Sequence, residues 1–513
     1  MTQSSPIRQH VAVLNEDLTI ALKAADVIKV KLVGAPGALV TLSLDTDGTP
    51  FDVALRRDGG EHHRSLLQKG EGRKHVVLQL PDDPAHLMIT ASIAGKLTLR
   101  QTGSIAADDL KAPPRDYLSP RIATLAQQLA TNASTDAFWH EVEAEGTPLV
   151  EEGEKGKPLL TFLFRGASRN VKMLGGPAND IYELERLEQS DVWFRSIAVP
   201  AGSLFSYQLA DNVPEFEGPA RAQRVAILAT AKADPFNHFP WPANAPDPFN
   251  QSSTFRVAGG DLEPWHEQAA SQRGTLTHYR LASERLSNSR DIWIHRSAGL
   301  DVSNDTTPLL FVFDGEQFLK KGLLDRSIDA LVESGRLRPM VTVFVSSIDN
   351  VVRARELPDS DAFADFMADE LLQFVIDQTG LTPRADRTIL SGSSFGGLGS
   401  TTIALKHPQE FGAVLSMSGS YWWSPEGAFQ GENAVARRVA TSEHKPVRFY
   451  LSSGLFETSR GDGFASILEP NRHLADVLLA KGYEVERAEF PTAHDMFAWR
   501  EILPQGLIQL VGK

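Results

Sequence analysis

The second half of the chain alternates short apolar runs with amphipathic stretches, and this alternation constrains the fold more than any other feature. From about residue 263 onward, runs rich in β-branched and aromatic residues recur, and stretches with helical spacing of apolar residues lie between them. The runs are Pro308–Gly315, Met340–Ser347, Arg387–Gly392, Phe411–Gly419, Val447–Gly454 and Glu484–Phe490. Near-continuous apolar strands joined by crossover helices predict a parallel sheet with helices on both faces. Ligands of such sheets bind beyond the carboxyl ends of the strands, so we expect a site in the loops that follow these runs.

Two strand-rich regions precede this α/β region. Residues 1–112 contain runs that alternate apolar with polar residues, separated by turn sequences, and they predict a β-sandwich-like domain. Residues 113–130 begin with paired prolines and polar residues and are interpreted as a linker. Residues 131–262 contain further strand-like runs and predict a second β-sandwich-like domain, which leaves residues 263–513 for the α/β domain.

Composition and charge exclude several classes of protein. A net charge of −14 over 513 residues argues against nucleic acid or an anionic membrane as the main partner, so an anionic substrate would need a local cluster of arginines. The chain has no cysteine and no apolar run near the roughly 18 residues that span a bilayer. Its start, MTQSSPIRQHVAVL, lacks the charged region and apolar core of a signal peptide. We therefore expect a cytoplasmic protein, or a periplasmic one if a signal peptide has been removed.

One serine in the α/β region has the surroundings of a nucleophile. Gly392-Ser393-Ser394-Phe395-Gly396 matches the pattern G-x-S-x-G and lies after a predicted strand and before a predicted helix. This is the position of the nucleophile elbow in an α/β-hydrolase, where glycines permit the tight turn. The sequence therefore predicts an α/β-hydrolase domain with Ser394 as its nucleophile.

A serine hydroxyl needs a base to take its proton, and the base needs an acid to orient it. In α/β-hydrolases both follow the serine, in the order acid and then histidine. His494 lies just after the last predicted strand, in the loop before the final helix, and is the predicted base. Glu457, three residues past Gly454, is the first choice for the acid, and Asp462 is the second.

The oxyanion of an acyl-transfer intermediate needs two hydrogen-bond donors. The elbow supplies the backbone N–H of Phe395, the residue after the predicted nucleophile. The second donor should come from the loop after an earlier strand, where the sequence FDGEQF offers the N–H of Gly315 or Glu316.

Several stretches together resemble the enterochelin (enterobactin) esterase family, in the esterase-D branch of the α/β-hydrolases. In the α/β region they are DIWIHRS, FVFDGEQF, SGSSFGGLGSTTIALKHPQEFGAVLSMSGSYWW and AHDMFAWR. Before it, SDVWFRSIAVPAGSLFSYQLAD and ADPFN are similar to that family's N-terminal β-domain, which the resemblance places at residues 131–262. The resemblance covers about residues 130–513, and residues 1–112 have no counterpart in the ordinary two-domain enzyme.

The resemblance implies a serine esterase that hydrolyses the lactone bonds of a catecholate siderophore such as ferric enterobactin, so that its iron can be released. It implies Ser394 as nucleophile and His494 as base, while Glu457 as acid is less secure because some relatives rely on a Ser–His pair. We expect no metal or organic cofactor, since iron would arrive only within the substrate. The partner would be the siderophore or its ferric complex, and no nucleic acid or membrane is expected.

A ferric tris-catecholate is anionic and aromatic, so its site should pair arginines with aromatic rings. Arg500, six residues after His494, is the predicted cation, and the aromatic residues of SGSYWW are the predicted rings: Tyr421, Trp422 and Trp423. Each has an ordinary structural alternative, because a tryptophan can simply be core and an arginine can bind helix carboxylates. The arginines of the sequence RAR at residues 353–355 are weaker candidates.

Two alternative functions stay open at this level. One is a related esterase or acyltransferase acting on other phenolic or carbohydrate esters, because the esterase-D branch also contains feruloyl esterases and mycolyl transferases. The other is a non-catalytic ligand-binding protein. Fold and catalytic residues cannot separate the two kinds of esterase, whereas labelling of the serine by a fluorophosphonate would separate an enzyme from a binding protein.

Overall fold

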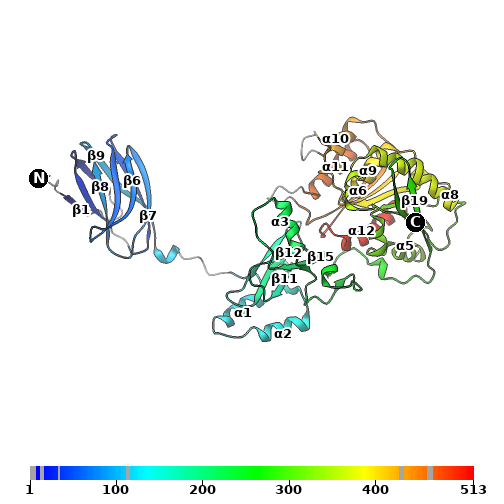
Figure 1. Cartoon of the computed structure of the whole chain (residues 1–513), viewed down its shortest axis with the longest axis horizontal. Coiled ribbons are helices and arrows are strands. Elements are labelled where there is room, and N and C mark those ends of the chain that lie inside the picture. The colour runs from blue at the N-terminus through cyan, green and yellow to red at the C-terminus, as the bar shows by residue number, and fades with distance from the viewer. Residues whose placement is uncertain are drawn as a thin grey trace. The chain divides into compact units, whose positions relative to one another are not determined.

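A computed structural model of the chain describes residues 7–11, 17–32, 35–110, 116–178, 181–304, 306–426, 433–458 and 466–512. It divides into two compact units, Met1–Asp116 and Tyr117–Lys513 (Figure 1). None of the described helices is long and apolar enough to cross a membrane.

The first unit is a β-sandwich. In its described part, one sheet has the order β1 (Ile7–Val11), β3 (Val27–Lys31), β8 (Ala85–Ala91), β5 (Phe51–Arg57) and β6 (His62–Gly70). The second sheet has the order β2 (Leu18–Leu22), β9 (Gly95–Ile105), β4 (Leu39–Thr46) and β7 (Arg73–Gln79), and a short 3-10 helix, η1 (Ala107–Leu110), follows. Alternate side chains point inward, as Val40, Leu42 and Leu44 do on β4, and both sheets share one core.

The second unit begins with α1 (Pro120–Leu129), α2 (Asp136–Glu145) and a long curved sheet. In the described residues its strands run in the order β10 (Leu149–Glu152), β11 (Pro158–Arg165), β14 (Val192–Ala198), β13 (Tyr182–Arg186), β12 (Val171–Gly175), β15 (Leu204–Asp211), β18 (Ser252–Arg256) and β17 (Pro240–Trp241). β16 (Ala231–Lys232) pairs with β15, and α3 (Ala220–Ile227) lies between them in sequence.

This sheet folds back on itself around a core of its own. Phe162 of β11 contacts Phe205 and Tyr207 of β15, with ring centroids 6.1 and 5.0 Å apart, although β11 and β15 are not neighbours in the sheet. The result is sandwich-like, as the strand-rich sequence predicted.

The rest of the second unit is an α/β domain around a mostly parallel sheet (Figure 1). In the described part the order is β19 (Thr275–Ser283), β20 (Asn288–Arg296), β22 (Val341–Val345), β21 (Leu309–Phe313), β23 (Thr388–Ser393), β24 (Ala413–Met417), β25 (Arg448–Gly454) and β26 (Val485–Phe490). Pairing is parallel from β22 to β26, whereas β19 and β20 form an antiparallel edge that was not among the predicted strands.

Helices cover both faces of this sheet. Along β21, Phe311 and Phe313 belong to one core, while Leu310 and Val312 belong to the other. The helices are α4 (Gly315–Lys320), α5 (Leu324–Glu333), α6 (Asn350–Glu356), α7 (Asp361–Asp365), a π-helix (Phe366–Leu371), α8 (Leu372–Thr379), α9 (Phe395–Lys406), α10 (Ala434–Thr441), α11 (Leu468–Ala480) and α12 (Met496–Val511). The predicted fold class, an α/β-hydrolase domain preceded by β-domains, is confirmed.

The curved sheet packs against the segment that leads into α12. The Leu204 N–H on β15 donates to the carbonyl of Pro491 at 3.1 Å, and the Ser206 N–H donates to the partly buried carboxylate of Asp495. Asp495 also caps α12 by accepting from the Phe497 N–H at 2.9 Å. Burial raises the pKa of Asp495. The β-domain therefore holds in place the loop that carries His494.

Candidate active site

Ser394 lies at a strained turn between β23 and α9. Its backbone has φ 58° and ψ −119°, a region that non-glycine residues rarely adopt, and its N–H donates to the carbonyl of Met417 at 3.0 Å. Two glycines around it are required by packing. A Cβ at Gly392 would lie 2.7 Å from the backbone of Gly396, and one at Gly397 would lie 2.4 Å from the Ser416 hydroxyl. This is the local geometry that a nucleophile elbow needs.

Ser394 and His494 line the same cavity, which has a volume of about 450 Å³. The cavity lies beyond the carboxyl ends of β21, β22 and β23, where the parallel sheet predicted a site. The Ser394 hydroxyl shares a hydrogen bond of 3.1 Å with the buried hydroxyl of Ser420. The other residues that line the cavity are Asp314, Glu316, Gln317, Ser347, Ile348, Asp349, Asn350, Arg353, Ser393, Met496 and Trp499.

Glu457 orients the histidine. Its Oε1 lies 2.6 Å from Nδ1 of His494, and its Oε2 accepts the Gly454 N–H at 2.6 Å. The carboxylate is fully buried, and the His494 ring packs edge-on against Trp499 with centroids 4.7 Å apart. A carboxylate at Nδ1 favours the tautomer with the proton on that nitrogen, which leaves Nε2 free to act as a base. Asp462, the second choice for the acid, lies outside the described residues.

The predicted oxyanion donors lie at the starts of two helices near the cavity. Phe395 is the first residue of α9, and Gly315 and Glu316 are the first two residues of α4, where N–H groups have no acceptor in a preceding turn. The position of Gly315 requires glycine, because a Cβ there would lie 2.5 Å from the backbone nitrogen of Val345. Glu316 lines the cavity directly.

A salt bridge that the sequence could not reveal ties this region together. Arg353 donates through Nε and Nη2 to the two carboxylate oxygens of Asp314, both at 2.7 Å, and Ser347 donates to the same carboxylate at 2.7 Å. The guanidinium also lies 5.7 Å from the ring of Phe395. Arg353 therefore connects the loop before α4 with the start of α9.

The structure corrects the prediction that Tyr421 contacts substrate. Tyr421 is fully buried, and its hydroxyl is hydrogen-bonded to Thr401 at 2.7 Å and to Ser416 at 2.8 Å. Burial raises the pKa of this phenol to about 12. Tyr421 therefore holds α9 against β24. Trp422 and Trp423 are partly buried, and neither is among the residues that line the Ser394 cavity; the ring of Trp422 lies 6.1 Å from that of Phe395.

Arg500 faces a different cavity from Ser394. At the start of α12, Met496 and Trp499 line the Ser394 cavity, whereas Phe497 and Arg500 line a second, neighbouring cavity. The guanidinium of Arg500 lies 4.0 Å from the ring centroid of Phe497 and 5.3 Å from that of Trp241. Desolvation by burial lowers the pKa of Arg500 to about 10.

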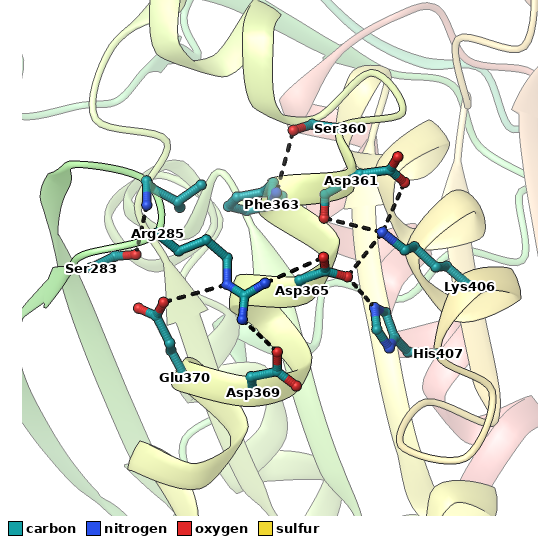
Figure 2. Close-up of polar contacts among 11 residues, drawn as sticks. Ser283, Arg285, Ser360, Asp361, Phe363, Asp365, Asp369, Glu370, Lys406 and His407 are labelled. Atoms are coloured by element: carbon teal, nitrogen blue, oxygen red, sulfur yellow. Dashed lines mark hydrogen bonds and ion pairs between the residues drawn. The ribbon is translucent and has the colours of Figure 1, made fainter.

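The His407 side chain belongs to a surface ion-pair network. Its Nε2 lies 2.9 Å from Asp365, which also binds Lys406 and, from the other side, Arg285 (Figure 2). The electrostatic contacts with Lys406 and His407 lower the pKa of Asp365. Among the residues that the structure describes, no group of three or more His, Asp or Glu side chains could hold a metal ion.

Comparison with known proteins agrees with this geometry. A strained serine in a mostly parallel α/β sheet, in one cavity with a histidine held by a carboxylate, is the arrangement of a serine hydrolase. Residues 282–510 match the model of a putative esterase family, and residues 159–266 match the N-terminal domain of enterochelin esterase. Both ranges lie in the second compact unit.

Several of the similar proteins are named as siderophore esterases. The iron(III) enterobactin esterase of Dickeya dadantii is 30% identical over 426 residues, which cover 75% of this chain and 94% of that protein. The iron(III) salmochelin esterase of Escherichia coli is 28% identical over 76% of this chain and 98% of its own length. The crystal structure of ferric enterobactin esterase from Salmonella typhimurium has a TM-score of 0.61, 26% identity, and coverage of 73% of this chain and 98% of that one. The chain belongs to the enterochelin esterase family.

Proposed function

We propose that this esterase hydrolyses the lactone bonds of a catecholate siderophore such as ferric enterobactin, so that the iron can be released. The observation that carries the proposal is the 30% identity to an iron(III) enterobactin esterase over 94% of that protein's length. A similar esterase from Shigella flexneri was crystallised in the presence of enterobactin, with a TM-score of 0.60, 26% identity, and coverage of 74% of this chain and 98% of that one. Iron enters within the substrate, and the reaction uses no further metal or organic cofactor.

The first half of the reaction forms an acyl-enzyme on Ser394. The hydroxyl leaves its hydrogen bond with Ser420, and its oxygen attacks the ester carbonyl carbon while Nε2 of His494 takes the proton. His494 becomes positively charged, and the buried carboxylate of Glu457 at 2.6 Å stabilises that charge. The N–H groups of Phe395 and of Gly315 or Glu316 stabilise the oxyanion.

The second half regenerates the enzyme. The ester C–O bond breaks, and His494 returns its proton to the departing seryl oxygen of the substrate. A water molecule then attacks the acyl carbon with His494 again as base, and the bond to Ser394 breaks as His494 returns that proton to the serine oxygen. Each cycle converts one ester into one hydroxyl and one carboxylate, so three cycles open and divide a trilactone.

Turnover of a panel of esters by purified protein tests the substrate class. Ferric enterobactin, a feruloyl sugar ester and a simple aryl ester are each incubated with wild type, Ser394→Ala and Ser334→Ala, an exposed serine that lines neither the Ser394 cavity nor its neighbour, and products are separated by chromatography. We expect wild type and the Ser334→Ala control to release dihydroxybenzoylserine, and Ser394→Ala to release none. If wild type cleaves the aryl and feruloyl esters but leaves the siderophore intact, the siderophore assignment is wrong while the mechanism stands.

A further inference from the structure

A second cavity lies on the face of α12 next to the one that lines the Ser394 cavity. Its volume is about 1140 Å³, against about 450 Å³ for the Ser394 cavity. Its walls come from residues 238–244 and β18 of the curved sheet and from α4, the start of α5 and α12 of the α/β domain. Among the described residues that line it, one is acidic, Glu267, and five are basic: Arg256, Lys320, Lys321, Arg326 and Arg500.

This concentration of positive charge is unusual for a chain with a net charge of −14. Two of the five cations have partners, since Arg256 pairs with the buried Glu501 at 2.5 Å and Lys320 lies 3.9 Å from Glu316. Within the described part of the chain, Lys321 and Arg326 have no such ion pair. The cavity therefore keeps an excess of positive charge, which favours an anion.

Arg500 offers a donor that the protein itself does not use. Only 6% of the residue is exposed, and its Nε has no hydrogen-bond partner among the described residues. A buried N–H without an acceptor is costly, so Arg500 gains from a ligand oxygen that reaches its guanidinium from the cavity. The guanidinium is flanked by the rings of Trp241 and Phe497, and a flat aromatic group can stack beside them.

His266, in the same wall, reports the field inside the cavity. It is 7% exposed, and its Nδ1 has no hydrogen-bond partner among the described residues. Desolvation by burial, together with the charges of Arg500, Arg256 and Arg326, lowers the pKa of His266 to about 4. Desolvation, the larger cause, disfavours charge of either sign, but the part of the shift that comes from the three arginines agrees with an excess of positive charge in the cavity.

We propose that this cavity is a second binding site, separate from the Ser394 cavity, for an aromatic group that carries a carboxylate. The carboxylate accepts from Arg500 and is attracted by Lys321 and Arg326, while the ring packs against Trp241. The choice of ligand rests on the proposed function, because each hydrolysis of a catecholate lactone leaves a product that carries both an aromatic ring and a new carboxylate.

The two cavities are close enough for one substrate to use both. On α4, Glu316 and Gln317 line the Ser394 cavity, whereas Lys320 at its end and Lys321 just after it line the second. Four residues of α-helix correspond to a rise of about 6 Å. A linear product freed at Ser394 can therefore place its carboxylate end in the second cavity while another ester approaches the serine.

Calorimetric titration with 2,3-dihydroxybenzoate tests the site without any turnover, because this probe has a ring and a carboxylate but no ester. Cyclohexanecarboxylate, which has the charge alone, and catechol, which has the ring alone, are the comparison probes. We expect 2,3-dihydroxybenzoate to bind most tightly. The double variant Lys321→Glu/Arg326→Glu, at two exposed positions, should weaken it about tenfold.

Two further variants separate the ring from the charge. Trp241→Leu should weaken 2,3-dihydroxybenzoate about fivefold and leave cyclohexanecarboxylate unchanged. The matched control Arg273→Glu/Arg338→Glu, at exposed arginines that line neither cavity, should bind like wild type. Equal affinity of the Lys321→Glu/Arg326→Glu variant and wild type overturns the inference, as does equal loss in the control. Neither result depends on siderophore hydrolysis, so failure of this site and failure of the proposed function remain distinguishable.

Discussion

Replacing Glu457 by glutamine removes one buried charge with almost no change of shape. Glu457 accepts from Nδ1 of His494 through one oxygen and from the Gly454 N–H through the other, both at 2.6 Å. The amide oxygen of Gln can keep the bond to Gly454. Its NH₂ group then faces Nδ1, which favours the tautomer with the proton on Nε2, where the Ser394 proton has to go.

The expected loss of rate follows from the charge that His494 acquires in the transition state. Two unit charges about 4 Å apart interact by about 4 kcal/mol at an effective dielectric constant of about 20. This corresponds to about a 10³-fold fall in kcat, and the unfavourable tautomer extends the range to about 10⁴-fold. KM for a small ester should change little, because the carboxylate is fully buried and does not line the cavity.

The assay is kcat and KM for a p-nitrophenyl ester, with the rate of fluorophosphonate labelling as a second readout. A melting temperature close to that of wild type shows that the variant is folded. If Glu457→Gln is folded and keeps kcat within about tenfold of wild type, Glu457 is not the acid, and the enzyme works with a Ser–His pair alone.

Three further predictions concern stability. Gly392→Ala should lower the free energy of unfolding by about 1–3 kcal/mol and abolish activity, because its Cβ would lie 2.7 Å from the Gly396 backbone. Gly396→Ala, whose Cβ meets its nearest atom at 3.4 Å, should fold normally in thermal melts, and equal melting temperatures of the two variants would contradict the packing argument. Tyr421→Phe should cost about 1–3 kcal/mol in urea denaturation with KM unchanged, and a raised KM at unchanged stability would instead indicate contact with substrate. The pKa of His266 is about 4 in the folded protein and about 6.5 in the unfolded chain. Between these two pH values only the unfolded chain binds a proton at His266, so the free energy of unfolding falls as the pH drops from about 6.5 to about 4. His266→Gln should therefore lose less free energy of unfolding than wild type between about pH 6.5 and 4, and parallel urea curves would refute this assignment.

The fold was predictable because its signals are local. A strand buried on both faces reads as a continuous apolar run, and β21 (Leu309–Phe313) lies within the predicted run Pro308–Gly315 with every residue buried. The antiparallel edge strand β19 was missed because its side chains alternate between exposed and half-buried positions, which weakens the apolar signal.

Sequence order also indicated which residues could meet at the site. In a parallel sheet the loops after successive strands lie along one edge, so Ser394, Glu457 and His494 could be chosen by their positions after strands. The pair Arg353 and Asp314 could not be found in this way. The two residues lie 39 positions apart on different loops, and no local pattern links them.

Neighbouring side chains in one motif can point in different directions, and sequence does not say which. Tyr421 resembles a substrate ligand in SGSYWW, yet it is fully buried beneath the elbow helix. Arg500 and Trp499 are adjacent on α12 and line different cavities, because successive helical residues are about 100° apart. Such choices depend on which face of the helix meets the neighbouring domain.

The most direct test of the account is a single-turnover experiment with ferric enterobactin and excess enzyme. The reaction is quenched in acid at short times, and the peptides are analysed by mass spectrometry for wild type and Ser394→Ala. We predict a transient acyl group of the siderophore on the wild-type peptide that contains Ser394, followed by free dihydroxybenzoylserine, and neither species with Ser394→Ala. Release of dihydroxybenzoylserine by Ser394→Ala at the wild-type rate would contradict the claim that this serine is the nucleophile.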